Sequence, residues 1–371
     1  MSTWHFHNPV RVHFGIDALD DIGDLLGGRS YALVTYPDAV FRDFARRIAE
    51  RAGTALIVID TIEPNPSIAM LERICAQLSG LPHKPQVLVA LGGGSVMDSA
   101  KVLAAGRGQW KPVFQALTGV ASDLSRALPI IAIPTTSGTG SEVTSWATVW
   151  DPVNEQKLSL SREDLYPEAV LVDPRLVAGL PRATTVACGL DALSHALESL
   201  WNVNANPITR GLAVQALREV MTGLKRLVDN LDDLDARRLM AQGSLRAGLA
   251  FSNTRTALAH NISYPITLRQ GIAHGIACSF CLPDVMRAAL GADAACDAAL
   301  EEIFGELSQA PNVLRRFLEG LGVSCEPISY GIDATHWRDI VTQAFDGVRG
   351  RNFIGSIDRF PFRDLVQTRY A

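Results

Sequence analysis

Short apolar runs alternate with amphipathic stretches through the first half of the chain. Five runs rich in branched residues predict β-strands at 30–35, 55–60, 86–93, 128–136 and 169–174. Between them, residues 41–53 and 67–80 repeat their apolar positions at helical spacing. Strands that alternate with helices predict an α/β domain, built on a parallel sheet with helices on both faces.

Beyond about residue 178 the apolar positions follow helical spacing almost throughout. Helical patterns cover 182–201, 208–228, 236–251 and 298–322, and strand-like runs are nearly absent. The sequence therefore predicts two domains, an α/β domain over residues 1–178 and an all-α domain over residues 179–371. The less regular stretch 346–371 is expected to cover a pocket or an interface.

Four residues of the helical half are candidates for one metal site: Asp191, His195, His260 and His274. The first two are four residues apart in a predicted helix, so their side chains share a face. The last two flank a segment in which Pro265 and Gly271 are expected to break the helix and turn the chain back. One carboxylate and three imidazoles suit Fe²⁺ or Zn²⁺. Packed core histidines and a helix-start aspartate are the alternative, and spacing alone leaves both interpretations open.

A glycine-rich turn, LGGGSVMDSAK at 91–101, follows one predicted strand and leads into a helix. Consecutive glycines let backbone N–H groups approach an anion, and the helix N-terminus adds positive partial charge. The turn fits a dinucleotide pyrophosphate, although it matches neither G-x-G-x-x-G nor the Walker sequence. A plain structural turn is the alternative.

A second polar loop, IPTTSGTGSEVT at 133–144, also follows a predicted strand. Thr135, Thr136 and Ser141 offer donors for ribose, phosphate or the nicotinamide amide. Lys157 is a further candidate for a ribose hydroxyl. The alternatives are a solvated Ser/Thr loop and a surface lysine.

Composition narrows the class of protein. With 371 residues, 20% charged residues and a net charge of −5, the chain is typical of a globular enzyme and gives no reason to expect nucleic acid or a membrane as partner. No apolar run approaches the roughly 20 residues that span a bilayer, and the N-terminus lacks the order of a signal peptide. We expect a cytoplasmic enzyme and, by the default for soluble oligomers, a homodimer.

Six cysteines occur without the spacing of a disulfide framework, which favours a reducing compartment: residues 75, 188, 278, 281, 296 and 325. Cys278 and Cys281 form a single C-x-x-C. Buried apolar thiols are the favoured interpretation of this pair, and redox or zinc chemistry is the alternative.

Taken together, these segments resemble the iron-containing alcohol dehydrogenase family, within the superfamily that also holds glycerol dehydrogenases and dehydroquinate synthases. The resemblance covers nearly the whole chain and rests on HFGIDAL (13–19), EPNPS (63–67), GGGSVMDSAK (92–101), IPTTSGTGSEVT (133–144), LVDP (171–174), GLDALSHALES (189–199) and HGIACSFCLP (274–283). It implies a Rossmann-like dinucleotide-binding domain followed by a helical metal-binding domain.

The resemblance also implies residue roles. Asp191, His195, His260 and His274 would be the ligands of Fe²⁺ or Zn²⁺ and thereby the catalytic set. Residues of the two polar loops would bind NAD or NADP: Gly92, Gly93, Gly94, Ser95, Asp98, Thr135, Thr136 and Ser141, with Lys101 in the same motif. Where relatives that prefer NAD often carry an acidic residue, this chain has Tyr36, followed by Asp38, so the choice of cofactor stays open.

One departure from the family pattern concerns the substrate. The segment FSNTRTALAH (251–260) places Arg255 where glycine is common, and Arg269 follows before His274. A guanidinium beside the metal would suit an anionic substrate, and Asn253 belongs to the same predicted contacts. These stretches resemble the phosphonoacetaldehyde reductase (hydroxyethylphosphonate dehydrogenase) branch. An internal carboxylate partner for the arginine is the alternative.

The expected reaction is reversible hydride transfer between NAD(P)H and a small aldehyde or primary alcohol, with phosphonoacetaldehyde favoured as substrate. Other interpretations stay open. One is a generic iron-type dehydrogenase of neutral alcohols, and another is a metal-independent enzyme of the maleylacetate reductase type. The last two alternatives are a lyase of the dehydroquinate synthase type and a non-catalytic nucleotide-binding protein.

Overall fold

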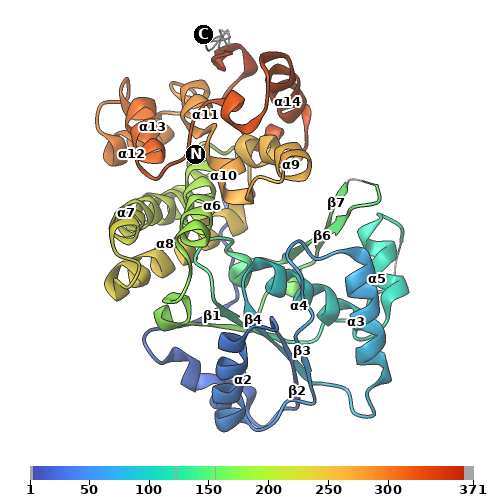
Figure 1. Ribbon diagram of the computed structural model, residues 1–371. Coiled ribbons are helices and arrows are strands. Elements are labelled where there is room, and N and C mark those ends of the chain that lie inside the picture. Colours follow the sequence, from blue (N-terminus) through green and yellow to red (C-terminus); the bar gives the residue numbers. More distant parts are fainter. Residues whose placement is uncertain (1–2, 122, 155, 363–371) are drawn as a thin grey trace. The chain divides into compact units, whose positions relative to one another are not determined.

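The computed structural model describes residues 3–121, 123–154 and 156–362, which divide into two compact units (Figure 1). One unit is Asn8–Gly179, and the other comprises the chain from Leu180 onward with the N-terminal segment up to His7. The backbone N–H of His7 donates to Asn253 Oδ1 at 2.8 Å. Two hydrogen-bonded positions, at His7 and at His5, thus attach the N-terminal segment to the helical unit.

The first unit contains a six-stranded parallel sheet in the part of the chain that is described. In spatial order its strands are β1 (Arg11–Phe14), β8 (Ala169–Val172), β5 (Ile130–Pro134), β4 (Val87–Gly92), β2 (Tyr31–Val34) and β3 (Ile57–Ile59). Five of them are the predicted strands, so the parallel-sheet prediction is confirmed. The sequence pattern missed β1, because this edge strand is exposed or half-buried along its length and lacks an apolar run.

Helices connect these strands: α1 (Ile22–Leu26), α2 (Ala39–Ala52), α3 (Ile68–Gly80), α4 (Gly94–Gly106) and α5 (Trp110–Leu117). An antiparallel hairpin that the pattern did not predict is formed by β6 (Trp146–Asp151) and β7 (Gln156–Ser161). β6 mixes half-buried with buried positions, and β7 is mostly exposed or half-buried, so neither shows the continuous apolar run of the central strands.

The order of the strands creates a ligand-binding position in this unit. β2 lies beside β4, but the chain leaves β2 toward β3 on one side and leaves β4 toward β5 on the other. Open parallel sheets bind ligands beyond the carboxyl ends of the strands at such a reversal. Thr35 Oγ1 donates to the carbonyl of Leu91 at 2.9 Å and joins the two strand ends. The glycine-rich turn therefore begins at the reversal.

The second unit is helical, as predicted. Its helices are α6 (Arg182–Leu200), α7 (Pro207–Asp229), α8 (Leu234–Thr254), α9 (Leu258–Gln270), α10 (His274–Ser279), α11 (Leu282–Ala289), α12 (Ala294–Phe304), α13 (Ala310–Gly320) and α14 (Ala334–Asp346). The apolar faces of these helices share one core. The predicted helical stretch 298–322 divides into α12 and α13 because Gly305, with φ 77°, ends the first helix.

The expectation that Pro265 breaks its helix was wrong. Pro265 lies inside α9, which continues to Gln270 and ends where Gly271 adopts φ 65°. A proline removes one backbone donor and usually destabilises a helix interior. Here Asn261, one turn earlier, is anchored to the next layer by its side chain, which donates to the carbonyl of Ala344 at 2.6 Å. Tertiary packing of α9 thus outweighs the local preference.

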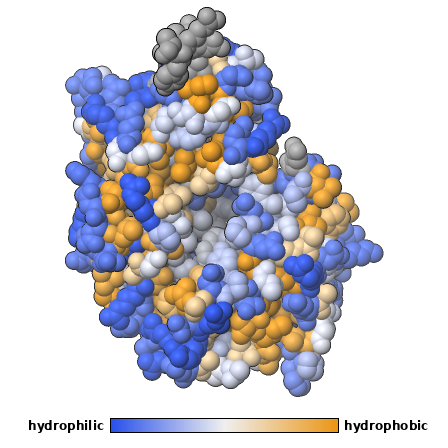
Figure 2. All heavy atoms as spheres, viewed as in Figure 1, coloured by the Kyte–Doolittle hydropathy of each residue, from blue (hydrophilic) through white to orange (hydrophobic). Residues whose placement is uncertain are grey.

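The surface carries no segregated apolar face in the view of Figure 2, where hydrophilic and hydrophobic residues are interspersed. Among the described residues, the exposed large apolar side chains are spread along the chain, from Trp4 to Val348. None of the described helices is both long and apolar enough to cross a membrane.

Candidate active site

Three of the four predicted metal ligands, Asp191, His260 and His274, bring donor atoms within 4.8 Å of one another in the helical unit. The fourth, His195, lies beside Asp191 but is not a member of that group. Asp191 and His195 lie one turn apart on α6, His260 lies on α9, and His274 is the first residue of α10. Asp191 Oδ1 is 3.8 Å from His195 Nε2 and 3.4 Å from His260 Nε2. The His260 ring centroid is 4.5 Å from that of His195 and 5.5 Å from that of His274.

Two atoms at the centre of this cluster lack hydrogen-bond partners. Asp191 Oδ1 and His260 Nε2 are buried and make no hydrogen bond in the described part of the chain, although they lie 3.4 Å from each other. A buried polar atom without a partner costs about 1–3 kcal/mol, so two such atoms that face each other indicate a missing ligand. A carboxylate oxygen and an imidazole nitrogen are both donors for Fe²⁺ or Zn²⁺. The residues present fit a divalent metal.

A thiol also faces this centre. The donor atoms of Asp191, His260, His274 and Cys278 all lie within 4.8 Å of one another, and Cys278 Sγ is 3.6 Å from His274 Nε2. Cys278 and Cys281 are both buried and form no disulfide. For Cys278, however, its position among the candidate donor atoms favours the metal alternative over the interpretation as an apolar core thiol. The sequence signal for the position of Cys278 is its spacing, four residues after His274 on α10, which places both side chains on one face.

Glu198 belongs to this cluster, although the sequence pattern did not single it out. It is fully buried on α6 and accepts from the backbone N–H of Ala257 at 2.8 Å and from that of His260 at 3.1 Å. Its Oε2 also lies 2.6 Å from His260 Nδ1. A carboxylate on the far ring nitrogen fixes the tautomer and orientation of a ligating histidine. The signal was present, because Glu198 follows Asp191 by two helical turns.

The carboxylates and imidazoles of the cluster shift one another's pKa values. Burial opposes a charge on Asp191, but His195, His260 and His274 hold the pKa of that carboxyl below its usual range. Burial also opposes charge on His260, yet the facing Cys278, Glu198 and Asp191 raise its pKa well above the usual histidine value. The His260 imidazole and three hydrogen bonds keep the pKa of Glu198 low despite its burial. The cluster is therefore built for positive charge at its centre.

In the first unit, the glycine-rich turn is set at the reversal of the sheet. Gly93 caps α4, whose first residue is Gly94, so the N-terminus of a 13-residue helix opens there. A Cβ on Gly93 would lie 3.1 Å from the Thr136 side chain, and one on Gly94 would lie 2.8 Å from that of Thr139. Glycine at these positions lets the two polar loops pack against each other. The arrangement is one that binds a phosphate group.

Asp98, Lys101 and Ser141 hold that second loop in place. Asp98 accepts from Ser141 Oγ at 2.6 Å and from the backbone N–H of Thr148 at 2.8 Å, which occupies both carboxylate oxygens. The buried Lys101 ammonium donates to Ser141, to Thr144 Oγ1 and to the Trp146 carbonyl. Asp98 and Lys101 are thus positioning residues for residues 141–148.

Comparison with known proteins decides the family. The sequence profile of iron-containing alcohol dehydrogenases matches residues 9–174, and that of the C-terminal domain of the Fe-containing alcohol dehydrogenase family matches residues 185–355. The chain belongs to the iron-containing alcohol dehydrogenase family. As a member, it is an oxidoreductase that acts on alcohols or aldehydes.

Individual relatives of this dehydrogenase differ in substrate. It is 35% identical to long-chain-alcohol dehydrogenase 1 of Geobacillus thermodenitrificans over 77% of this chain and 73% of the relative. It is 34% identical to phosphonoacetaldehyde reductase of Streptomyces viridochromogenes over 71% of this chain and 68% of the relative. Among solved structures, sulfoacetaldehyde reductase from Bifidobacterium kashiwanohense in complex with NAD⁺ matches with a TM-score of 0.89, 26% identity and 96% coverage of both chains.

The predicted substrate residues of this family member lie in the helical unit. Arg255 and Arg269 are both exposed, so the fold does not remove either guanidinium from water. Arg255 adopts φ 67° and ψ 170°, a conformation that glycine favours. Asn253 Oδ1 accepts from His7 N–H and its Nδ2 donates to the Leu249 carbonyl, so its amide links the N-terminal segment to α8.

The remaining predicted cofactor residues of the dehydrogenase lie on the sheet unit. Tyr36 follows β2 and packs edge-on against Phe41, and Asp38 is the exposed N-cap residue of α2. Lys157, on β7, lies with its Nζ 5.5 Å from the Trp150 ring centroid across the hairpin. Asp38 is therefore the acidic group nearest in sequence to the end of β2, at the reversal of the sheet.

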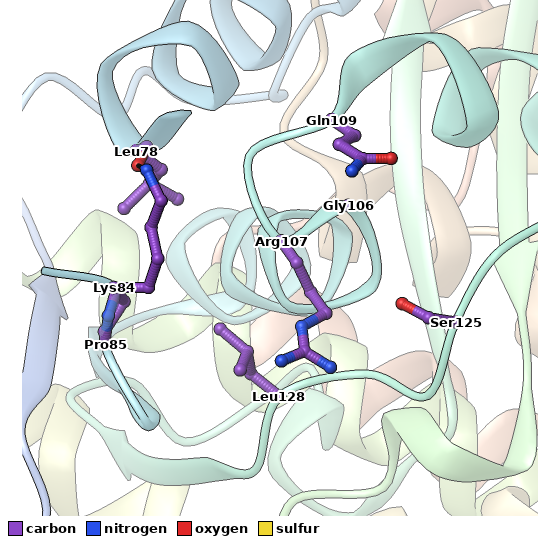
Figure 3. A pocket seen from close by; sticks show the side chains of 8 residues that line it. All are labelled: Leu78, Lys84, Pro85, Gly106, Arg107, Gln109, Ser125 and Leu128. Carbon is purple, nitrogen blue, oxygen red and sulfur yellow. Dashed lines mark hydrogen bonds between the residues drawn. The ribbon is translucent and has the colours of Figure 1, made fainter. Parts of the chain in front are cut away.

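A pocket of about 330 Å³ in the same unit does not coincide with these loops (Figure 3). It is lined by residues at the end of α3 and α4 and by the segments that lead into β4 and β5, among them Lys84, Arg107 and Leu128. It therefore lies at the amino ends of the strands, the edge opposite to the glycine-rich turn. The Lys84 ammonium already donates hydrogen bonds to the carbonyls of Leu78, Ser79 and Leu81.

Proposed function

We propose that this chain reduces a small aldehyde to its primary alcohol with NADH or NADPH, in a reaction that depends on a divalent metal and reverses with the alcohol. Asp191, His195, His260 and His274 would hold Fe²⁺ or Zn²⁺. The observation that carries the proposal is the pair of buried atoms at the cluster's centre that make no hydrogen bond, Asp191 Oδ1 and His260 Nε2. Family membership supplies the reaction type.

When bound, such a metal supplies Lewis acidity, which polarises a carbonyl and stabilises the alkoxide that develops on its oxygen. The protein's part is orientation. Glu198 fixes the His260 ring so that Nε2 points to the centre. His274 is the half-exposed member of the cluster, whereas Asp191, His195 and His260 are buried, so a substrate has access from the His274 side. Burial of the other donors excludes water from the remaining directions.

For the cofactor, we propose that the pyrophosphate of NAD(P)H binds at the N-terminus of α4, on the backbone of Gly92, Gly93, Gly94 and Ser95. The sheet reversal and the helix N-terminus support this position. Thr135, Thr136 and Ser141 lie in the loop that Asp98 and Lys101 hold against the turn. The cofactor itself supplies the hydride.

We further propose that the aldehyde carries an anionic tail, with phosphonoacetaldehyde as the favoured substrate. Two relatives support this class, since their names describe reduction of a phosphonate and of a sulfonate aldehyde. A dehydrogenase of neutral long-chain alcohols is the second candidate, which the Geobacillus relative and the exposure of Arg255 favour.

The test is a panel of aldehydes, neutral against phosphonate and carboxylate, with NADH and with NADPH after reconstitution with Fe²⁺ or Zn²⁺. We expect chelation to abolish turnover and phosphonoacetaldehyde to have the highest kcat/KM. Turnover that survives chelation would favour a metal-independent reductase, and a preference for neutral substrates would favour the second candidate. The metal content of the His195→Ala and Cys278→Ala variants tests which of these two residues is a metal ligand. We expect His195→Ala to lose more metal than Cys278→Ala.

A further inference from the structure

Arg349 is an arginine near the candidate metal centre that the sequence pattern did not single out. It precedes the short 3-10 helix η6 (Gly350–Asn352) and is half-buried. Its Nε donates to Thr256 Oγ1 at 3.0 Å, and Asn352 Nδ2 donates to the Thr256 carbonyl at 2.8 Å. A Cβ on Gly350 would lie 2.1 Å from the Ala344 carbonyl oxygen, so this segment is tightly packed.

The guanidinium of Arg349 is connected to the metal centre through one aromatic ring. Its Cζ lies 5.0 Å from the ring centroid of Tyr264, within the range of a cation–π interaction. The Tyr264 ring is in turn nearly parallel to the His274 imidazole, at an interplanar angle of 4° and a centroid distance of 6.1 Å. Tyr264 and His274 are both half-buried, so Arg349 stands on the side from which the donors are accessible.

No carboxylate neutralises this guanidinium within 4.0 Å among residues 3–121, 123–154 and 156–362. The two contacts that hold Arg349, Thr256 Oγ1 and the Tyr264 ring, leave the terminal Nη1 and Nη2 donors without a hydrogen-bond partner in the same residues. Half-buried arginines usually pair with an anion, because removing the charge from water is costly. Arg162 and Arg315 in this chain show that pairing with Asp164 and Glu326.

We propose that Arg349 binds the anionic end of the substrate while the carbonyl end faces the metal donors. The inference rests on the proposed function and adds a recognition residue to it. A guanidinium whose Nε is already fixed presents Nη1 and Nη2 as a planar fork, which suits two oxygens of a phosphonate, sulfonate or carboxylate. Thr256 and Tyr264 fix the fork, so little rotamer entropy is lost on binding. Arg349 thereby selects small aldehydes with a negative tail.

The experiment compares Arg349→Gln with Arg351→Gln in the metal-reconstituted enzyme. Arg351 is the matched control, since it lies in the same segment but is exposed. The probe is methylphosphonate as an inhibitor of the reduction of a neutral aldehyde, together with KM and kcat for phosphonoacetaldehyde. We expect Arg349→Gln to raise the inhibition constant and the phosphonoacetaldehyde KM roughly 10- to 100-fold. The kcat/KM for the neutral aldehyde and all constants of Arg351→Gln should stay near wild type.

Several outcomes overturn the assignment. Equal losses on neutral and anionic aldehydes would make Arg349 a structural residue, and so would wild-type inhibition in Arg349→Gln. If Arg349→Gln loses its metal or unfolds, Arg349→Lys decides, because it keeps the charge but loses the fork and should restore part of the affinity for methylphosphonate. Failure of the proposed function looks different: the wild-type enzyme would then show no metal-dependent reduction, or no preference for anionic aldehydes.

Discussion

The backbone of Gly275 lies directly against the carbonyl oxygen of Ala187. A Cβ on Gly275 would be 1.9 Å from that oxygen and 3.0 Å from the backbone nitrogen of Asp191. Real Cβ atoms do not approach backbone so closely, so α10 can lie against α6 only if this residue is glycine. Because His274 precedes Gly275 and Asp191 follows Ala187 by one turn, the contact sets the distance between two candidate metal donors.

Substitution of Gly275 by alanine should therefore separate the donors. The side chain would push α10 away from α6, and we expect unfolding free energy to fall by about 2–3 kcal/mol, the usual cost of overpacking. Bound metal per chain should fall as well, measured by elemental analysis after reconstitution. Gly211→Ala on α7 is the control, because nothing lies within 4 Å of its Cβ position. A Gly275→Ala variant with wild-type metal content would contradict this account.

Glu198→Gln should weaken metal binding without emptying the space that Glu198 fills. An amide NH₂ that faces His260 Nδ1 would donate to it and move the ring proton to Nε2, the atom aimed at the metal centre. Loss of such an orienting partner typically costs 10- to 100-fold in metal affinity. Competition with a chromophoric chelator measures that affinity. Glu301→Gln, on an exposed position of α12, should bind metal as wild type does, and equal affinities in the two variants would exclude an orienting role for Glu198.

The sequence predicted most of the sheet, the long helices and the four candidate metal ligands, because those depend on local periodicity and on spacing along a helix. Helical spacing puts Glu198 on a face with Asp191 and Cys278 on a face with His274, but only the packing of α9 and α10 against α6 shows that these faces meet at one point. The location of Arg349 was equally hidden, because its neighbours Thr256 and Tyr264 are distant in sequence. The expectation for Pro265 was wrong for the opposite reason, because packing of α9 outweighed the local tendency of proline to break a helix.

Glu142 should make stability fall with rising pH in the sheet unit. Burial raises the pKa of its carboxyl from 4.5 to about 7, so the folded state holds a proton between these values that the unfolded state has lost. Stability from this group is thus present at low pH, declines through that window and stays reduced above it. Glu142→Gln should match wild type near pH 4.5 and be more stable at pH 8, by at most about 3 kcal/mol.

Denaturant unfolding of both proteins at several pH values measures the difference. Glu50→Gln, at an exposed position of α2, provides the control and should track wild type at every pH. A Glu142→Gln variant that is less stable than wild type at pH 8 would mean that the ionised carboxylate contributes favourably, through the nearby Lys101.

Arg255→Gly should stabilise the protein and weaken the binding of anionic substrates at the same time. Arg255 ends α8 with φ 67° and ψ 170°, a backbone region that costs a non-glycine residue about 1–3 kcal/mol. Glycine removes that strain but adds freedom to the unfolded chain, so we expect a net gain of about 1 kcal/mol. If the guanidinium contacts the anionic tail, the KM for phosphonoacetaldehyde should rise while that for a neutral aldehyde stays constant.

Arg107→Gly is the matched control, because Arg107 also has a positive φ, 50°, and lies in the other unit. It should gain stability without any change in KM, and the same result for Arg255→Gly would leave Arg255 without a role in substrate binding.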